Sequence, residues 1–234
     1  MKITVIYGTN RTEKSSTYNI ARQFLAELAD GDPVTEFHLP KDMPKFCKSC
    51  SICFTDETKC PDYDYLKPIL DAVKAADLVI FTVPVYVYHA PGQVKAFLDH
   101  CAYLWMPHRP EPAMFKKQAL IISTAAGAGM KSAVKDVKDS LDFWGIAKTW
   151  TVKKAVQSSD WETVTEKRKT EIAEKVDKTA GKIRRCKGAG PRLKVKLLFY
   201  WMRSMQKRMG FSKTDVAYWR ENGWLAGKKP WKKT

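Results

Sequence analysis

The sequence lacks both a membrane-length apolar run and a secretion signal. None of its apolar stretches approaches the roughly 20 residues that a membrane-spanning helix needs. The N-terminus leads directly into a candidate strand, without the charged and apolar regions of a signal peptide. We therefore expect a cytosolic location, in which the six cysteines indicate metal or redox chemistry rather than disulfides.

Two nucleotide-binding signatures are also missing. The chain has neither the Gly-Lys-Ser/Thr ending of a P-loop nor a G-x-G-x-x-G fingerprint, and no motif that reads DNA or RNA. The net charge of +16 is therefore no sign of a nucleic-acid partner, and it is unevenly spread. Residues 1–150 carry 18 Lys and Arg against 17 Asp and Glu, whereas residues 151–234 carry 23 against 8. The basic excess is a property of the C-terminal third.

Apolar, β-branched runs alternate with helical patterns along the first two thirds of the chain. The expected strands are 3–7, 34–39, 78–83, 119–123 and 148–152, and the expected helices are 17–28, 65–75, 93–105 and 131–143. This order predicts an α/β fold with a doubly wound, five-stranded parallel sheet. Such sheets bind ligands at the carboxyl ends of their strands, so the loops that follow strong strands are the candidate site.

Three of these loops carry informative residues. In residues 8–17, Gly8 lets the backbone turn, and hydroxyls and amides at a helix start can donate to phosphate oxygens. The plainer alternative is a capped helix start with Ser16 or Thr17 as the N-cap. Residues 84–91 place two tyrosines and a histidine between prolines, which suits contact with a flat ring but also suits simple gap filling. Residues 124–129 offer small side chains and accessible amides.

A compact loop holds four cysteines in the pattern C-x2-C-x2-C-x6-C. Four thiolates at this spacing satisfy the ligand requirement of a [4Fe–4S] cluster. A four-thiol zinc site and free or disulfide-bonded thiols are the alternatives. The four candidate metal ligands are Cys47, Cys50, Cys53 and Cys60. We interpret Cys101 and Cys186, which lie outside this loop, as packing or surface thiols.

Together these segments resemble the flavodoxin-like NAD(P)H-dependent FMN reductase family, and in particular its iron–sulfur flavoprotein branch. The segments GTNRTEKSST, VPVYVYHAPGQVKAFLD and STAAGAG correspond to the family's three flavin loops, and the cysteine loop lies where that branch carries its own. The resemblance covers roughly residues 1–150. Asn10 stands where the family usually has proline, and His100 stands where arginine is common.

The resemblance implies an enzyme that passes electrons from NAD(P)H through bound FMN to a quinone, a flavin or another small acceptor. The alternative is an electron carrier with a [4Fe–4S] cluster that serves a redox-protein partner. Because the flavin supplies the redox chemistry, no side chain is expected to be catalytic. The implied FMN-binding residues are Gly8, Thr9, Asn10, Arg11, Ser15, Ser16, Thr17, Pro84, Val85, Tyr86, Val87, Tyr88, His89, Thr124, Ala125, Ala126, Gly127 and Gly129.

The chain divides into a flavodoxin-like FMN-binding domain, residues 1–157, and a basic, mainly helical extension, residues 158–234. Helices are expected over 161–185 and 191–209, and the aromatic segment 215–225 is expected to pack. An apolar stripe on the second helix comprises Leu198, Trp201, Met202, Met205 and Met209. This stripe either docks on the flavin domain or a second subunit, in a homodimer or larger oligomer, or makes a peripheral contact with an anionic membrane.

Overall fold

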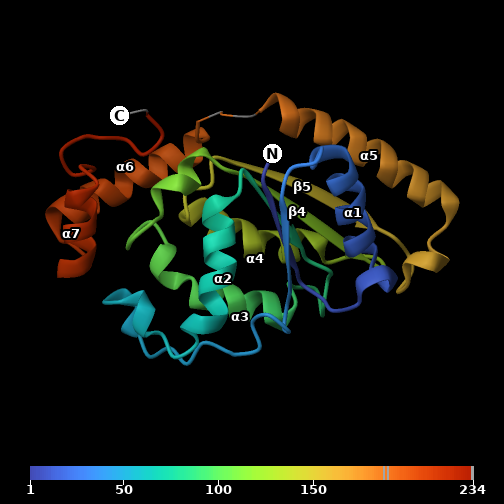
Figure 1. Cartoon of the computed structure of the whole chain (residues 1–234), viewed down its shortest axis with the longest axis horizontal. Helices are drawn as coiled ribbons and strands as arrows, with labels where there is room; N and C mark the ends of the chain where they lie inside the picture. The colour runs from blue at the N-terminus through green and yellow to red at the C-terminus, as the bar shows by residue number, and fades with distance from the viewer. Residues whose placement is uncertain (187, 189, 233–234) are drawn as a thin grey trace.

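A computed structural model of the protein describes residues 1–186, 188 and 190–232. One parallel sheet runs through its centre, with strand order β2-β1-β3-β4-β5 (Figure 1). The strands are β1 (Ile3–Tyr7), β2 (Val34–His38), β3 (Leu78–Thr82), β4 (Gln118–Ala125) and β5 (Lys148–Ala155). This arrangement confirms the doubly wound α/β fold that the strand and helix pattern predicts.

Helices cover both faces of the sheet. One face packs against α1 (Ser16–Leu28) and α5 (Glu166–Arg185). The other packs against α2 (Tyr63–Ala75), α3 (Gly92–His100) and α4 (Met130–Phe143). Successive strand residues point to opposite faces, so Val5 joins the core beneath α1 while Ile6 joins the core beneath α2 to α4. All of β3 is buried, which explains its unbroken apolar sequence.

Several helix boundaries differ from the sequence prediction. The helix expected over 93–105 ends at His100, a short 3-10 helix follows it, and Met106 enters a third core. The helix expected over 161–185 begins at Glu166. The N-cap of α1 is Ser15 rather than Ser16 or Thr17. Six short 3-10 helices occupy the connections: Thr12–Lys14, Ile52–Phe54, Glu57–Lys59, Ala102–Leu104, Pro112–Lys116 and Trp161–Thr163.

The C-terminal extension packs in two different places. Its first helix, α5, lies beside α1 and contributes Ile172 and Val176 to a core of the sheet. The helices α6 (Leu193–Arg208) and α7 (Lys213–Glu221) form the third core at one end of the molecule (Figure 1). There Phe199 and Trp219 stack, with ring centroids 5.2 Å apart. The division at residue 157 thus falls before a helix that covers the sheet, and the division itself stays a prediction.

A buried carboxylate joins the third core to the sheet. Asp142 in α4 accepts hydrogen bonds from Lys138 and Lys194, each 2.7 Å long, and it also accepts one from Arg192. Burial alone would raise the pKa of Asp142, but the hydrogen bonds from Lys138 and Lys194 and the charge of Arg192 outweigh it and lower that pKa. Asp142 therefore remains ionised and holds the start of α6 against α4.

Candidate functional site

The loops at the carboxyl ends of four strands converge on one cavity of about 230 Å³. Three of them are the loops identified in the sequence, and the fourth follows β5. The lining residues from the first three are Thr9, Arg11, Ser15, Ser16, Pro84, Val85, Tyr86, Thr124, Ala125 and Ala126. The fourth loop contributes Val156, Ser158 and Ser159. The expectation that ligands bind at the carboxyl ends of the strands also applies to the fourth loop. We did not predict that loop from the sequence because it has no distinctive motif.

The first loop places the N-terminus of α1 at this cavity. Ser15 has extended backbone dihedrals, and its hydroxyl group accepts a hydrogen bond from the amide of Tyr18 at 3.4 Å. The same hydroxyl shares a hydrogen bond with that of Thr17 at 3.0 Å. Within the described part of the chain, the amides of Ser16 and Thr17 donate to no backbone carbonyl. Free amides at the positive end of a 13-residue helix form an anion site.

Hydrogen bonds link the first loop to its neighbours. The hydroxyl groups of Thr9 and Tyr86 lie 3.3 Å apart, and the side-chain amide of Gln93 donates to the Gly8 carbonyl at 2.7 Å. Arg11 forms an ion pair with Asp160 at 3.1 Å, which closes the cavity on the side of the fourth loop. The loops around the cavity are therefore joined by side-chain contacts rather than independent of one another.

The second loop contains a strained two-residue turn. Val87 and Tyr88 have φ values of 46° and 67°, and Tyr86 and His89 exchange two backbone hydrogen bonds across the turn, each 3.0 Å long. Such a conformation suits Asn-Gly, and it is unfavourable for a β-branched valine. Val87 is also 95% exposed. Strain of this kind persists where the surroundings impose it, which is common at ligand sites.

Asp136 in α4 holds this strained turn in place. Its carboxylate lies 3.1 Å from Nδ1 of His89 and accepts a hydrogen bond of 3.1 Å from the amide of Ala90. His89 is therefore turned toward α4 rather than toward the cavity, so its expected role beside a flavin ring remains a prediction. Nothing in the sequence pattern pointed to Asp136, because the residue lies 46 positions from Ala90.

The glycines of the site have different roles. A Cβ atom at Gly8 would lie 2.4 Å from the carbonyl oxygen of Thr82, so this glycine lets β1 end close to β3. Gly129 has φ of +93°, and a Cβ atom there would lie 2.9 Å from the Cα atom of Tyr88. Gly129 therefore permits close packing of the second and third loops rather than contact between backbone and ligand. Gly127, in contrast, faces open space.

Eight of the predicted flavin-binding residues lie outside the lining of this cavity. They flank it in the same loops, so their contact with a bound cofactor stays a prediction. These residues are Gly8, Asn10, Thr17, Val87, Tyr88, His89, Gly127 and Gly129.

The cysteine loop is a separate feature, between α2, α3 and the C-terminal extension. The four cysteine residues line one cavity of about 20 Å³ together with Asp62 and His100, which lie 3.1 Å apart. Burial raises the pKa of the Cys53 thiol, and its cysteine neighbours raise it further. Cys101 is buried, in agreement with its interpretation as a packing thiol.

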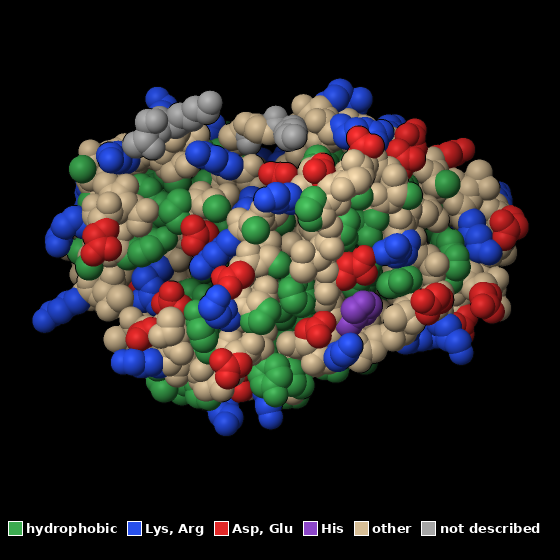
Figure 2. Space-filling view, viewed as in Figure 1, with side chains coloured by type: hydrophobic (Ala, Val, Ile, Leu, Met, Phe, Trp, Pro, Cys, Tyr) green, Lys and Arg blue, Asp and Glu red, His purple; other side chains and the backbone are tan. Residues whose placement is uncertain are grey.

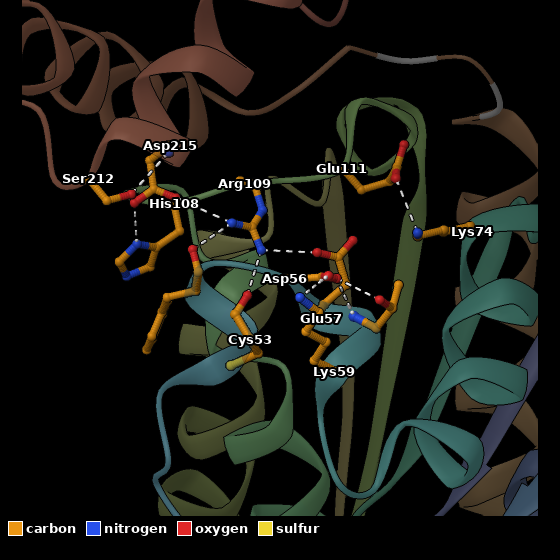
Figure 3. Close-up of polar contacts among 12 residues, drawn as sticks. Cys53, Asp56, Glu57, Lys59, Lys74, His108, Arg109, Glu111, Ser212 and Asp215 are labelled. Atoms are coloured by element: carbon orange, nitrogen blue, oxygen red, sulfur yellow. Dashed lines mark hydrogen bonds and ion pairs between the residues drawn. The ribbon is translucent and has the colours of Figure 1, made fainter.

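Arg109 fastens this loop to the rest of the protein (Figure 3). Its guanidinium group donates to the carbonyl oxygens of Cys53 and Phe54 at 2.5 and 2.7 Å, and it pairs with Glu57 at 3.0 Å. Asp215 in α7 lies 3.9 Å from the same guanidinium group. A larger hollow of about 470 Å³ adjoins Arg109, and both of its cationic residues are already paired, Lys74 with Glu111 at 3.5 Å and Arg109 with Glu57 at 3.0 Å.

The donor set of the cysteine loop fits an iron–sulfur cluster in its chemistry, since four thiols surround one cavity. In their described positions, however, no three Cys, His, Asp or Glu side chains form a group that could hold a metal ion. Binding of a cluster would therefore require the loop to close further around it.

The fold and the cavity define a class of protein, the flavodoxin-like oxidoreductases. The family described as NADPH-dependent FMN reductase matches residues 1–163. The chain therefore belongs to that family, and it is an FMN-dependent enzyme that uses a reduced nicotinamide as its electron donor. This result confirms the resemblance that the sequence motifs indicate.

Individual relatives and solved structures agree with this membership. The chain is 26% identical over 148 residues to the iron-sulfur flavoprotein of Methanosarcina thermophila, covering 62% of this chain and 75% of the relative. It is 27% identical over 180 residues to the FMN-dependent NADH:quinone oxidoreductase of Pelagibacter ubique, covering 69% and 93%. The azoreductase structure from Bacillus anthracis superposes with a TM-score of 0.62 at 18% identity, covering 78% and 99%, which shows a shared fold.

Proposed function

We propose that the cavity formed by the four loops is the FMN site. The observation that carries this assignment is the pair of free amides of Ser16 and Thr17 at the start of α1, beside the hydroxyl group of Ser15. These groups would hold the phosphate. Tyr86, Ala125 and Ala126, which line the same cavity, would contact the ring.

Bound FMN would supply the hydride chemistry, and the protein would supply position and electrostatics. The hydrogen bond between Thr9 and Tyr86 fixes the distance between the phosphate loop and the second loop. The ion pair between Arg11 and Asp160 holds the first loop to the fourth loop, after β5. Asp136 contacts Nδ1 of His89 and so fixes the orientation of the histidine ring.

We further propose a quinone or an azo compound as the electron acceptor. Two observations support this class: relatives are FMN-dependent NADH:quinone oxidoreductases, and the fold is that of azoreductases. The cavity walls agree with a flat acceptor, because the exposed Tyr86 and Tyr88 offer ring faces beside the opening. Steady-state assays with a quinone, an azo dye and free flavin would rank these acceptors.

The assignment of the FMN site is tested by placing a negative charge at the anion site. Ser16→Asp puts a carboxylate beside the two free amides, so we expect FMN affinity to fall at least about a hundredfold, since one charge-assisted bond is lost and repulsion replaces it. Thr170→Asp, an exposed residue on α5, adds the same charge elsewhere and should bind FMN normally. Unchanged FMN affinity of the Ser16 variant would contradict the assignment.

A second candidate function is that of an iron–sulfur flavoprotein electron carrier. It is favoured by the four thiols around one cavity and by the relatives of that name. A carrier would accept electrons from a protein donor and would not turn over NAD(P)H. Steady-state NAD(P)H oxidation by the FMN-loaded protein therefore separates the two functions.

We also infer a reducing compartment and a homo-oligomer. All six cysteines are free, which agrees with a cytosolic protein. The described residues contain no helix that is both long and apolar enough to cross a membrane.

A second subunit would cover the exposed Val87 and Tyr88 at the cavity opening. Sedimentation of the FMN-loaded protein would measure the oligomeric state.

A further inference from the structure

Helix α6 has two apolar faces, of which only one is used within the chain. Val195, Phe199 and Met202 are buried in the third core. Leu193, Leu197 and Trp201 are 72%, 59% and 58% exposed, respectively. At about 100° per residue, these three side chains lie on the side of the helix opposite the buried face. The stripe predicted from the sequence was therefore only partly right: Met202 packs inside, but Trp201 does not.

The exposed apolar surface continues past the end of α6. Met209 and Phe211, just beyond the end of α6, are also exposed, at 70% and 43%. Scattered exposed apolar residues need no explanation, but three large apolar side chains on one helix face indicate an interaction surface. We call Leu193, Leu197 and Trp201, together with Met209 and Phe211 that follow the helix, the outer stripe.

Positive charge borders the outer stripe on one side and also lies within it. Eleven Lys and Arg residues and no Asp or Glu occur between Lys182 and Lys213. Of these, Lys196, Lys207 and Arg208 form no ion pair within the described residues. At the helical repeat, Lys196 and Lys207 lie on one side of the stripe and Arg208 among its apolar residues. Figure 2 shows Lys and Arg side chains around hydrophobic ones at the end of the molecule formed by α6 and α7.

We propose that the outer stripe binds the surface of a membrane that contains anionic lipids. Its apolar side chains would enter the boundary between headgroups and acyl chains, with Trp201 at the level of the headgroups. The flanking Lys and Arg would pair with lipid phosphates or carboxylates. This is a peripheral contact, parallel to the membrane, and it goes beyond the proposed redox function.

The positive charge around the outer stripe favours an anionic membrane, rather than a second copy of the chain, as its binding partner. A symmetric dimer presents the same patch from both subunits. The outer stripe would then bring Lys196, Lys207 and Arg208 of one copy against the same residues of the other, with no acidic residue of this segment to pair with them. An anionic lipid surface supplies the missing negative charge. The rigid packing of Phe199 and Trp219 beneath the helix also means that binding requires no unfolding.

The test is flotation of the full-length, FMN-loaded protein with vesicles of phosphatidylcholine, with and without phosphatidylserine. We expect binding to the mixed vesicles, weak binding to phosphatidylcholine alone, and loss of binding at high salt. Leu197→Ser with Trp201→Ser should weaken binding about tenfold or more, because apolar area no longer enters the membrane. Lys207→Glu with Arg208→Glu should weaken it at least about twentyfold, since each basic residue contributes roughly fivefold.

Control variants carry a charge reversal and an aromatic removal on other surfaces. Lys175→Glu with Lys178→Glu reverses two exposed charges on α5, and Tyr65→Ser removes an exposed aromatic side chain from α2. Both should bind vesicles nearly as well as the native protein and unfold at the same temperature. Absence of binding to mixed vesicles, or a Leu197 and Trp201 variant that binds normally, overturns the proposal. A native dimer that the same variant dissociates, without vesicle binding, would assign the stripe to a second copy.

Discussion

The hydroxyl groups of Thr9 and Tyr86 lie 3.3 Å apart and connect two loops that are 77 residues apart in the chain. Thr9 also accepts a hydrogen bond from the amide of Arg11 at 3.2 Å, so it orders its own loop as well. The contact couples the anion site at α1 to the strained turn of the second loop. A ligand that bridges the two loops would therefore find its two ends already positioned.

Removal of one hydroxyl group should measure this coupling. We expect Tyr86→Phe to weaken FMN binding about fivefold, the equivalent of one net hydrogen bond of about 1 kcal/mol, while the ring is retained. Fluorescence titration of FMN into the apoprotein gives the dissociation constant. Tyr88→Phe is the control, because Tyr88 lies outside the cavity lining. Equal effects of the two changes would show that the link does not organise the site.

The strained turn should be destabilising by itself. Val87→Gly removes the steric conflict of a β-branched residue at φ of 46°, so we expect the free energy of unfolding to rise by about 1 kcal/mol. Thr151→Gly, at an exposed strand position in β5, should instead lower it by roughly 0.5–1 kcal/mol. Urea unfolding of both variants, without FMN, tests the pair. A Val87 variant less stable than the native protein would contradict the assignment of strain.

Because the pKa of Asp142 is lowered in the folded protein, we expect the free energy of unfolding to fall at acidic pH. Its pKa is lower in the folded protein than in the unfolded chain, so its stabilisation is complete above the unfolded value of about 4. That stabilisation disappears as the pH falls through the lower, folded-state pKa. Asp142→Asn should lower the free energy of unfolding at neutral pH by about 3 kcal/mol, because three cationic side chains lose their partner.

The comparison across pH provides the control for that variant. The difference between Asp142→Asn and the native protein should shrink as the pH falls below about 4 and through the lower, folded-state pKa, because the native carboxylate becomes protonated over that range. Urea midpoints at several pH values give the curve. A difference that stays constant with pH would mean that packing, rather than charge, accounts for the effect.

Iron content decides the role of the cysteine loop. If the four thiols bind a cluster, protein purified without oxygen from iron-supplied cells should contain about four irons per chain. Cys50→Ser should then lose iron and keep FMN, because Cys50 lies outside the lining of the FMN cavity. Cys186→Ser is the matched control, since that thiol is outside the loop. Iron-free native protein would exclude the electron-carrier function.

Much of the fold was predictable because the local sequence patterns of the strands agree with their burial in the complete sheet. The apolar runs of β3 and β4 are buried on both faces, and their ends place Pro84 and Thr124 at one edge of the sheet. The resemblance to a known family added the identity of the cofactor. The position of α5 against α1 was less evident, since its few buried residues are separated by charged ones.

Other features depend on contacts between distant residues, which no local pattern records. Asp136 holds the second loop, and Arg109 holds the cysteine loop, yet each belongs to a segment without a motif. The buried face of α6 was also misjudged, because helical periodicity shows that apolar side chains share a face but not which face meets the protein. Trp201 belongs to the predicted stripe but is 58% exposed, whereas Val195, outside that stripe, is buried in the third core.

Gly127 and Gly129 in the third loop differ in how well they would tolerate a side chain. Any side chain at position 129 would press on Tyr88 and Val85, so a change there would displace the second loop before it altered selectivity. Position 127 has no neighbouring atom within 4 Å of a new Cβ. Libraries that aim to alter the range of acceptors should therefore vary residue 127 and leave residue 129 untouched.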